Sequence, residues 1–285
     1  MTLNFRPINP VDYVTIGHVT QDLTPQGPRL GGTASYSSLT ARSLGLRAGI
    51  VTACSEDADI SILDGITVAG FRTDQCTTFE NIHTPEGRIQ FLHHRAPMIE
   101  LHHVPETWRK SPIIHLGPIA QEIDVNLVRA FPDSIVGLTI QGWLRSWDKN
   151  GRVHFSEWPE ASFVLNHATV AVVSIEDVQG SEKYIEELAS MVKMLIVTEG
   201  PKGARLYWKG DVRRFTPPVR EEIDPTGAGD IFAAAFFYRL NATKDPWESA
   251  RFATLLASFS VTRKGLEGIP TPEEIQACTM QVIPK

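Results

Sequence analysis

The stretch DPTGAGD at residues 224–230 places two glycines around an alanine, and an apolar run over residues 231–238 follows it. Glycines allow a tight turn and let a ligand approach the main chain closely. If a helix begins here, its first N–H groups and the positive end of its dipole form an anion site. A carboxylate repels a phosphate, but Asp230 is useful there if it takes a proton from a hydroxyl that attacks the phosphate. The stretch therefore predicts phosphoryl transfer to an alcohol, or, in the plainer alternative, a loop whose Asp caps a helix.

The composition limits the classes of protein to consider. At 285 residues the chain can bury a large core, and an α/β protein of this length can form one domain. A formal net charge of -6 argues against a nucleic-acid partner, which favours a basic face. Residues 1–10 lack the basic and apolar regions of a secretory signal, and no apolar run approaches a membrane span. We therefore expect a cytoplasmic protein that binds neither nucleic acid nor membrane.

The three cysteines, Cys54, Cys76 and Cys278, are widely scattered along the chain. Their number is odd, and their spacing is unlike that of a metal site. We therefore expect three reduced thiols, as is usual in the cytoplasm.

Short apolar runs typical of strands alternate with segments that suit helices. Several runs are continuously apolar, as expected for strands that a parallel sheet buries on both faces. The predicted strands are 13–17, 48–53, 113–117, 134–140 and 195–198, and the predicted helices include 33–44 and 182–192. This alternation predicts a doubly wound, mostly parallel α/β sheet with helices on both faces. Ligands of such folds bind beyond the carboxyl ends of the strands.

Two segments interrupt this pattern. Residues 21–30 contain two prolines and a glycine, which predicts a loop or a short ribbon. Residues 76–98 read as two strands joined by a turn at 84–87. We expect one domain over residues 1–285, in which residues 18–30 and 76–98 form a small β lid over the active site.

Taken in order, these motifs resemble the ribokinase/pfkB family of ATP-dependent carbohydrate kinases over nearly the whole chain. The quoted motifs are IGH at 16–18 leading to Asp22, the di-glycine at 31–32, TEGPKG at 198–203, DPTGAGD at 224–230 and TRKGLEGIP at 262–270. Within the family the chain leans toward the myo-inositol kinase-like branch, because of GGTASYSS at 31–38 and QGWLRSWD at 141–148. The resemblance implies a ribokinase-like fold and transfer of phosphate from ATP to a small sugar or polyol.

The resemblance also assigns the catalytic residues. Asp230 would be the general base that aligns or deprotonates the acceptor hydroxyl. The N–H groups of Gly227, Ala228 and Gly229 would stabilise charge on the transferred phosphoryl group.

For the acceptor, the resemblance points to a carboxylate that accepts hydrogen bonds from substrate hydroxyls, here Asp22, and to Gly31 and Gly32 beside it. Tyr36 stands where the family often has an Asn that contacts the sugar, which argues against ribose-like recognition. Arg95 follows the predicted hairpin, where it either reaches the substrate when the lid closes or is simply solvated.

For the donor, the resemblance implies ATP with Mg²⁺, and it allows for K⁺. The residues expected to contact the nucleotide are Thr198, Gly200, Gly203, Thr226 and Gly265. The family's N-x-x-E motif, which helps to organise magnesium, corresponds to SIED at 174–177, so either Asp177 or Glu176 would hold Mg²⁺ through water. Asp224 would help to ligate a monovalent cation, since hard cations prefer oxygen.

Three functions remain open at this point. The first is a MgATP-dependent sugar or polyol kinase, possibly of myo-inositol. The second is a nucleoside kinase of the same fold, in which Tyr36, Phe79 and Phe91 would stack a base. The third is a non-catalytic sugar- or nucleotide-binding module. Only eight residues separate Asp22 from Gly31, which leaves little room for the lid of dimeric relatives and favours a monomer.

Overall fold

The computed structural model describes residues 8–25, 27–56, 58–84 and 87–279. Its strands are β1 (Tyr13–Ile16), β2 (Thr20–Leu23), β3 (Arg29–Gly31), β4 (Ala48–Cys54), β5 (Thr67–Arg72), β6 (Thr77–Thr84), β7 (Gly87–His94), β8 (Ile113–Leu116), β9 (Ile135–Thr139), β10 (Arg145–Trp147), β11 (Val153–Phe155), β12 (Val170–Ser174), β13 (Met194–Thr198), β14 (Ala204–Trp208) and β15 (Asp211–Phe215). Its α-helices are α1 (Thr33–Ser43), α2 (Ala161–His167), α3 (Glu182–Met191), α4 (Ala228–Thr243), α5 (Pro246–Ser260) and α6 (Pro272–Cys278).

The main sheet of the described residues has nine strands in the order β15-β14-β13-β12-β9-β8-β1-β4-β5. Neighbours from β5 to β13 pair in parallel, and β14 and β15 close the other edge as antiparallel strands. The five strands predicted from their apolar runs are all present, and so are the helices predicted at 33–44 and 182–192. The predicted mostly parallel α/β sheet is confirmed.

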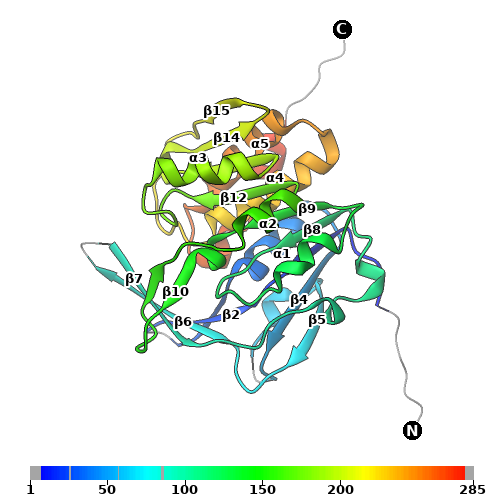
Figure 1. Cartoon of the computed structure of the whole chain (residues 1–285), viewed down its shortest axis with the longest axis vertical. Helices are drawn as coiled ribbons and strands as arrows, with labels where there is room; N and C mark the ends of the chain where they lie inside the picture. The colour runs from blue at the N-terminus through cyan, green and yellow to red at the C-terminus, as the bar shows by residue number, and fades with distance from the viewer. Residues whose placement is uncertain (1–7, 26, 57, 85–86, 280–285) are drawn as a thin grey trace.

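Helices cover both faces of this sheet, and Figure 1 shows α2 and α3 in front of it. Successive residues of the central strands enter opposite cores because side chains alternate along a strand. Val172 and Ile196 join the core that contains the side chains of α1, α4 and α5. Val173 and Val197 join the core on the other face, with α2 and α3. This double burial explains why the strands read as continuous apolar runs.

A second sheet forms the lid, with strand order β3-β2-β6-β7. β6 ends at Thr84 and β7 begins at Gly87, and the centre of the predicted turn, residues 85–86, lies outside the described residues. In Figure 1 these strands extend to the lower left of the main sheet. The β6–β7 hairpin supplies most of the lid, so the short spacing between Asp22 and Gly31 does not limit the lid's size. A monomer therefore stays a prediction without that support.

A short antiparallel ribbon, β10 and β11, runs beside the lid. Phe91 of β7 forms a β-bridge with Arg152, and the N–H of Leu92 donates to the carbonyl of Gly151 over 2.8 Å. Phe79 and Leu92 of the lid form a small core with Ile119 and Ala120, against which Trp147 packs. The ribbon thus connects the lid to the residues that follow β9.

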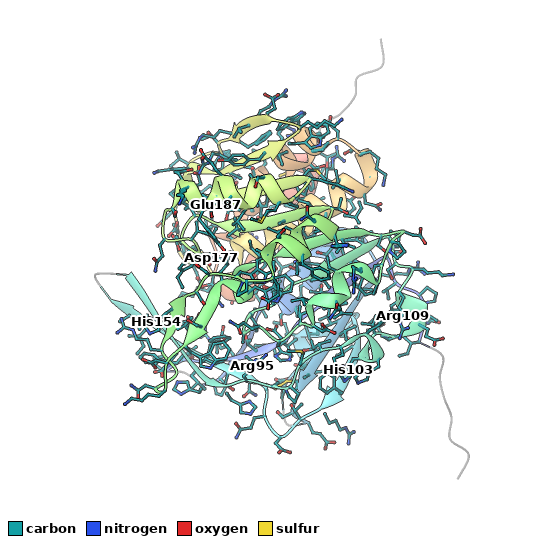
Figure 2. All side chains as sticks on the ribbon, viewed as in Figure 1. Arg95, His103, Arg109, His154, Asp177 and Glu187 are labelled. Carbon is teal, nitrogen blue, oxygen red and sulfur yellow. A yellow bond between two sulfur atoms is a disulfide. The ribbon has the colours of Figure 1, made fainter. Side chains whose placement is uncertain are left out.

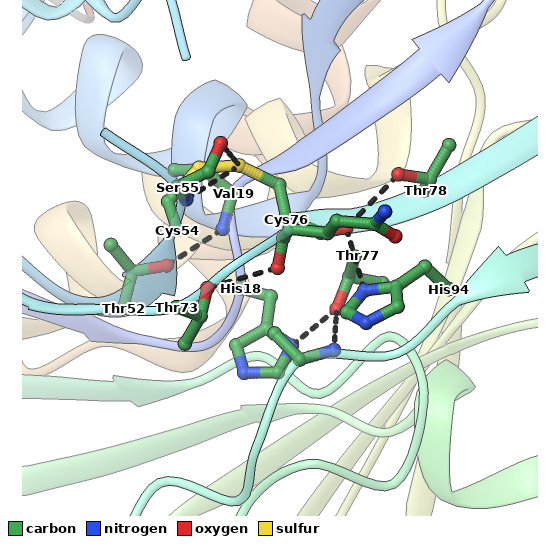
Figure 3. Close-up of a disulfide and its surroundings, with 12 residues drawn as sticks. His18, Val19, Thr52, Cys54, Ser55, Thr73, Cys76, Thr77, Thr78 and His94 are labelled. Atoms are coloured by element: carbon green, nitrogen blue, oxygen red, sulfur yellow. Dashed lines mark hydrogen bonds between the residues drawn. A yellow bond between two sulfur atoms is a disulfide. The ribbon is translucent and has the colours of Figure 1, made fainter. Parts of the chain in front are cut away.

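The expectation of three reduced thiols is wrong, because Cys54 and Cys76 form a disulfide (Figure 3). The bond joins the end of β4 in the main sheet to the residue before β6 in the lid. The N–H of Ser55 lies 3.2 Å from the sulfur of Cys76, and Cys278 is free and buried. The separation of 22 residues hid this pairing in the sequence. Reduced thiols therefore no longer support a cytoplasmic location, which stays a prediction.

Among the described residues, no helix combines the length and the apolar character that crossing a bilayer requires.

Candidate active site

The DPTGAGD stretch turns into the first residues of α4, as its sequence predicts. Gly227 is the N-cap of this helix, with a φ of 81°, a conformation that glycine adopts without strain. The N–H of Ala228 donates to the carbonyl of Pro225 over 3.2 Å, and that of Ile231 to Gly227 over 2.9 Å. Gly229 is exposed, and a Cβ built on it meets nothing within 4 Å. Open space therefore adjoins the helix end that favours an anion.

Tyr36 of α1 lies directly against this turn. A Cβ at Gly227 would come within 2.2 Å of two carbons of the tyrosine ring, and a Cβ at Gly265 would lie 3.6 Å from its hydroxyl. Only 4% of Tyr36 is exposed. Burial raises the pKa of Tyr36, and nearby Asp22, Asp224 and Asp230 raise it further. Tyr36 therefore packs as a support beneath the turn, among three carboxylates.

Asp230, in the first turn of α4, is partly buried and held by a hydroxyl. Thr33, the first residue of α1, donates to Asp230 Oδ1 over 2.7 Å. Burial raises the pKa of Asp230 to about 6; the Thr33 hydrogen bond and the positive charge of Arg145 oppose this rise, and the negative charge of Asp177 adds to it. A carboxylate with such a pKa is a stronger base than an ordinary Asp and is still ionised at neutral pH.

Two further polar residues reach this carboxylate through Thr33, and the sequence reasoning did not identify them. The Gln141 amide donates to Thr33 Oγ1 over 3.1 Å, and Arg145 Nη2 donates to Gln141 Oε1 over 2.8 Å. Both belong to the QGWLRSWD string noted above, which directly follows the carboxyl end of β9. The place of this string after a strand end could have identified Gln141 and Arg145, because ligand sites of such sheets lie at the carboxyl ends of the strands.

The lid brings Asp22 of β2 over the di-glycine that precedes α1. A Cβ at Gly31 would lie 2.4 Å from Asp22 Oδ2, and one at Gly32 would lie 2.7 Å from the carbonyl of His18. Thr20 donates to Asp22 Oδ1 over 3.1 Å. Glycine at 31 thus leaves room for the lid carboxylate, and glycine at 32 leaves room for the carbonyl of His18.

Asp224 connects the turn before α4 to the segment at Gly265. One carboxylate oxygen accepts the N–H of Thr226 and the other accepts the N–H of Gly265, each over 2.9 Å. The carboxylate of Asp224 thus ties the turn before α4 to the segment at Gly265 through both of its oxygens.

Asp177 and Glu176, the two magnesium candidates, differ in their surroundings. Asp177 is partly buried, accepts the N–H of Ser174 over 3.1 Å, and its charge reaches Asp230. Glu176 is exposed. Figure 2 shows Asp177 in the upper half of the molecule and Arg95 in the lower half, toward the lid.

The expected nucleotide loop begins at the carboxyl end of β13 with Thr198. Gly200 and Gly203 have φ values of 55° and 92°, and a Cβ at Gly203 would collide with the carbonyl of Phe215. The side chain of Glu199, between Thr198 and Gly200, is almost fully buried and pairs with Arg205 over 2.9 Å and with Arg214. These ion pairs hold the loop against β14 and β15.

Arg95 and the lid aromatics belong to the β6–β7 hairpin and the residue that follows it. Arg95 is exposed, donates to the carbonyl of Gln121 over 2.6 Å and lies 5.8 Å above the ring of Trp147. Phe79 is 3% exposed and belongs to the small core beneath the lid. Phe91 stacks on His93 with ring centroids 6.5 Å apart.

The family model described as "pfkB family carbohydrate kinase" matches residues 155–273. The cytidine kinase of Thermococcus kodakarensis is 25% identical over 250 residues, which cover 79% of this chain and 87% of the relative. The inositol 3-kinase of Oryza sativa subsp. japonica is 42% identical over 87 residues, which cover 29% of this chain and 21% of the relative.

Solved structures with the same fold cover nearly all of the chain. A pyrophosphate-dependent kinase in the ribokinase family, complexed with a pyrophosphate analog and myo-inositol, superposes with a TM-score of 0.77 at 20% identity, over 94% of this chain and all of that one. The Arabidopsis thaliana ribokinase complexed with ribose and ATP superposes with a TM-score of 0.73 at 17% identity, over 95% of this chain and 99% of that one. At these identities the likeness establishes the fold.

Proposed function

We propose that this chain, which belongs to the pfkB family of carbohydrate kinases, transfers the γ-phosphoryl group of ATP to a hydroxyl of a small, uncharged polyol. Enzymes of this family are phosphotransferases with an alcohol group as acceptor. The first candidate for the polyol is myo-inositol. The observation that carries the proposal is the position of Asp230. Its carboxylate lies in the first turn of α4, beside the open helix end at Gly229 and within reach of the Thr33 hydroxyl.

The reaction proposed here moves one proton and one phosphoryl group. The acceptor hydroxyl gives its proton to Asp230 while its oxygen bonds to the γ-phosphorus, and the bond from that phosphorus to the bridging oxygen breaks to release ADP. The end of α4 stabilises the negative charge that develops on the phosphoryl oxygens. Base assistance of this kind is worth roughly 10²–10⁴-fold in rate.

Magnesium fits this site as a partner of the phosphates rather than of a protein cage. No cluster of three or more His, Cys, Asp or Glu side chains suited to a metal occurs among the described residues. Mg²⁺ commonly binds through one or two carboxylates together with substrate phosphates. We assign the protein ligand, through water, to Asp177 because its charge reaches Asp230, whereas Glu176 is exposed.

An acceptor rich in hydroxyls suits the polar groups in and around the site. Asp22 comes from the lid, Asp230 from α4 and Gln141 from the turn after β9, and carboxylates and amides bind hydroxyls. The nucleoside alternative called for Tyr36, Phe79 and Phe91 to stack a base; Tyr36 and Phe79 are almost fully buried, whereas Phe91 is partly exposed. The cytidine kinase relative nevertheless makes nucleosides the necessary second group in an acceptor panel.

The test is phosphoryl transfer measured with MgATP, and separately with magnesium pyrophosphate, against inositols, hexoses, pentoses and nucleosides. The Asp230→Asn variant runs in parallel. We expect turnover with ATP and an inositol that disappears in the variant. Turnover with nucleosides alone, or with pyrophosphate alone, would overturn the proposed acceptor or donor respectively.

A further inference from the structure

Three side chains form a continuous hydrogen-bonded chain that ends at Asp230. Arg145 Nη2 lies 2.8 Å from Gln141 Oε1, Gln141 Nε2 lies 3.1 Å from Thr33 Oγ1, and Thr33 Oγ1 lies 2.7 Å from Asp230 Oδ1. The segments that contribute these residues are far apart in sequence, and Thr33 and Asp230 are separated by 197 positions. The fold therefore brings these hydrogen-bonded side chains together.

The chemistry of the four groups fixes the direction of every bond. A guanidinium only donates, so the atom of Gln141 that faces Arg145 must be the amide oxygen. The amide nitrogen then faces Thr33 and donates to its oxygen. The hydroxyl proton of Thr33 is left to point at Asp230, whose ionised carboxylate only accepts. No link in this chain can reverse while Asp230 is ionised.

We propose that Arg145, Gln141 and Thr33 are positioning residues, which act as a one-way chain that holds Asp230 Oδ1 and reserves Oδ2 for the acceptor hydroxyl. The inference rests on the proposed role of Asp230 as the base. A carboxylate held by one oxygen has a fixed orientation, and orientation determines how well a base meets its proton. The chain also delivers a donor to the ionised form, which favours that form over the acid.

Arg145, where the chain begins, is itself fixed by neighbours of the lid. Its Nη1 donates to the carbonyl of Ile119 over 3.2 Å, and its own carbonyl accepts the Gln121 amide over 2.5 Å. The guanidinium lies 6.0 Å from the ring of Phe79, a member of the small core beneath the lid. The chain thus links the lid side of the site to the catalytic carboxylate.

Several charged or titratable groups face Asp230 and must be separated from the effect of Thr33. Arg145 lowers the pKa of Asp230 and Asp177 raises it. The buried phenols of Tyr13 and Tyr36 both feel the charge of Asp230. A substitution at Thr33 leaves all four in place, so a change in titration can be assigned to the lost hydroxyl.

The test compares Thr33→Val, which keeps the shape and the methyl group, with Thr33→Ser, which keeps the hydroxyl. Titration of the Asp230 side chain is followed by carboxyl ¹³C NMR in the protein without substrate, with the resonance assigned by its loss in Asp230→Asn. Removing a hydrogen bond to an ionised group should raise the pKa of Asp230 by about one unit in Thr33→Val, and Thr33→Ser should restore it. In Gln141→Glu the new carboxylate cannot donate to Thr33, and it competes with Asp230 for the Thr33 hydroxyl proton. The pKa of Asp230 should therefore rise at least as far as in Thr33→Val.

The kinetic measurements use as substrate the acceptor that is identified among the inositols, hexoses, pentoses and nucleosides. In Thr33→Val we expect kcat/KM at neutral pH to fall about tenfold or more, and the acid limb of its pH profile to move to higher pH. Unchanged titration in both Thr33→Val and Gln141→Glu would overturn the proposal even if the wild-type protein is an active kinase. If the pKa of Asp230 shifts in these variants but the wild-type protein has no kinase activity, the hydrogen-bonded chain would be supported and the proposed function overturned.

Discussion

The ring of Tyr36 lies so close beneath Gly227 that a Cβ at residue 227 would come within 2.2 Å of two ring carbons. The Tyr36 ring therefore supports the turn that begins α4, and the turn requires glycine at residue 227. Tyr36, which stands where the family often has an Asn that contacts the sugar, packs against this turn, and its contact with a substrate stays a prediction.

The first prediction follows from this contact. Gly227→Ala should abolish turnover, because the added methyl collides with Tyr36 and the φ of 81° disfavours any residue with a side chain. Gly229→Ala is the matched control, since a Cβ there meets nothing within 4 Å and the helix favours alanine. We expect the control to fold and to bind ATP. Turnover at the wild-type rate in Gly227→Ala would contradict the assigned role of the turn.

The second prediction concerns stability and pH. The folded-state pKa of Asp230 is about 6, above the ordinary value of 3.8, so the folded protein binds this proton more tightly than the unfolded chain does. Its contribution to stability is therefore lost as the pH rises from about 4 through about 6. Asp230→Asn does not titrate, and it should be more stable than the wild type by at most about 3 kcal/mol above pH 7, with little difference below pH 4. Urea unfolding at several pH values measures the gap, and a gap that is constant with pH would count against a perturbed Asp230.

The third prediction concerns the disulfide that joins β4 to the lid. Closing a loop of this size stabilises a protein by roughly 3 kcal/mol in the chain-entropy model. A dithiol reductant should therefore lower the melting temperature of the wild type, and it should leave a Cys54→Ala/Cys76→Ala double variant unchanged. Cys278→Ala is the control that retains the reductant effect. A wild-type melting temperature that does not respond to reductant would argue that the bond contributes little.

The fourth prediction separates the two magnesium candidates. Asp177→Ala should raise the Mg²⁺ concentration needed for half-maximal turnover, because the substitution removes a carboxylate whose charge reaches Asp230. Glu176→Ala should behave like the wild type, since that side chain is exposed. Magnesium titrations of both variants at saturating ATP provide the measurement, and the reverse order of effects would reassign the ligand.

The sequence was sufficient to predict the fold because its signals are local. Buried parallel strands are continuously apolar, so the run at 48–53 identified β4 (Ala48–Cys54), and the glycines at 227 and 229 marked the start of α4. β5 (Thr67–Arg72) was missed because much of this edge strand is exposed and its residues carry no such run.

The parts of the site that could not be predicted depend on contacts between distant segments. Thr33 reads as an ordinary residue of a helix until the fold brings it against Asp230. The pairing of Cys54 with Cys76 and the burial of Tyr36 beneath Gly227 likewise follow from packing rather than from local pattern. Residue type and order identified Asp230 as the candidate base, whereas its hydrogen-bond partners required the three-dimensional structure.

The most direct test of the central claim is transfer of labelled γ-phosphate from MgATP to myo-inositol by the wild type and by Asp230→Asn, with ATP binding measured for both. We expect labelled inositol phosphate from the wild type, and a rate at least 10²-fold lower from a variant that still binds ATP. A variant that transfers phosphate at the wild-type rate would contradict the role of Asp230 as the base.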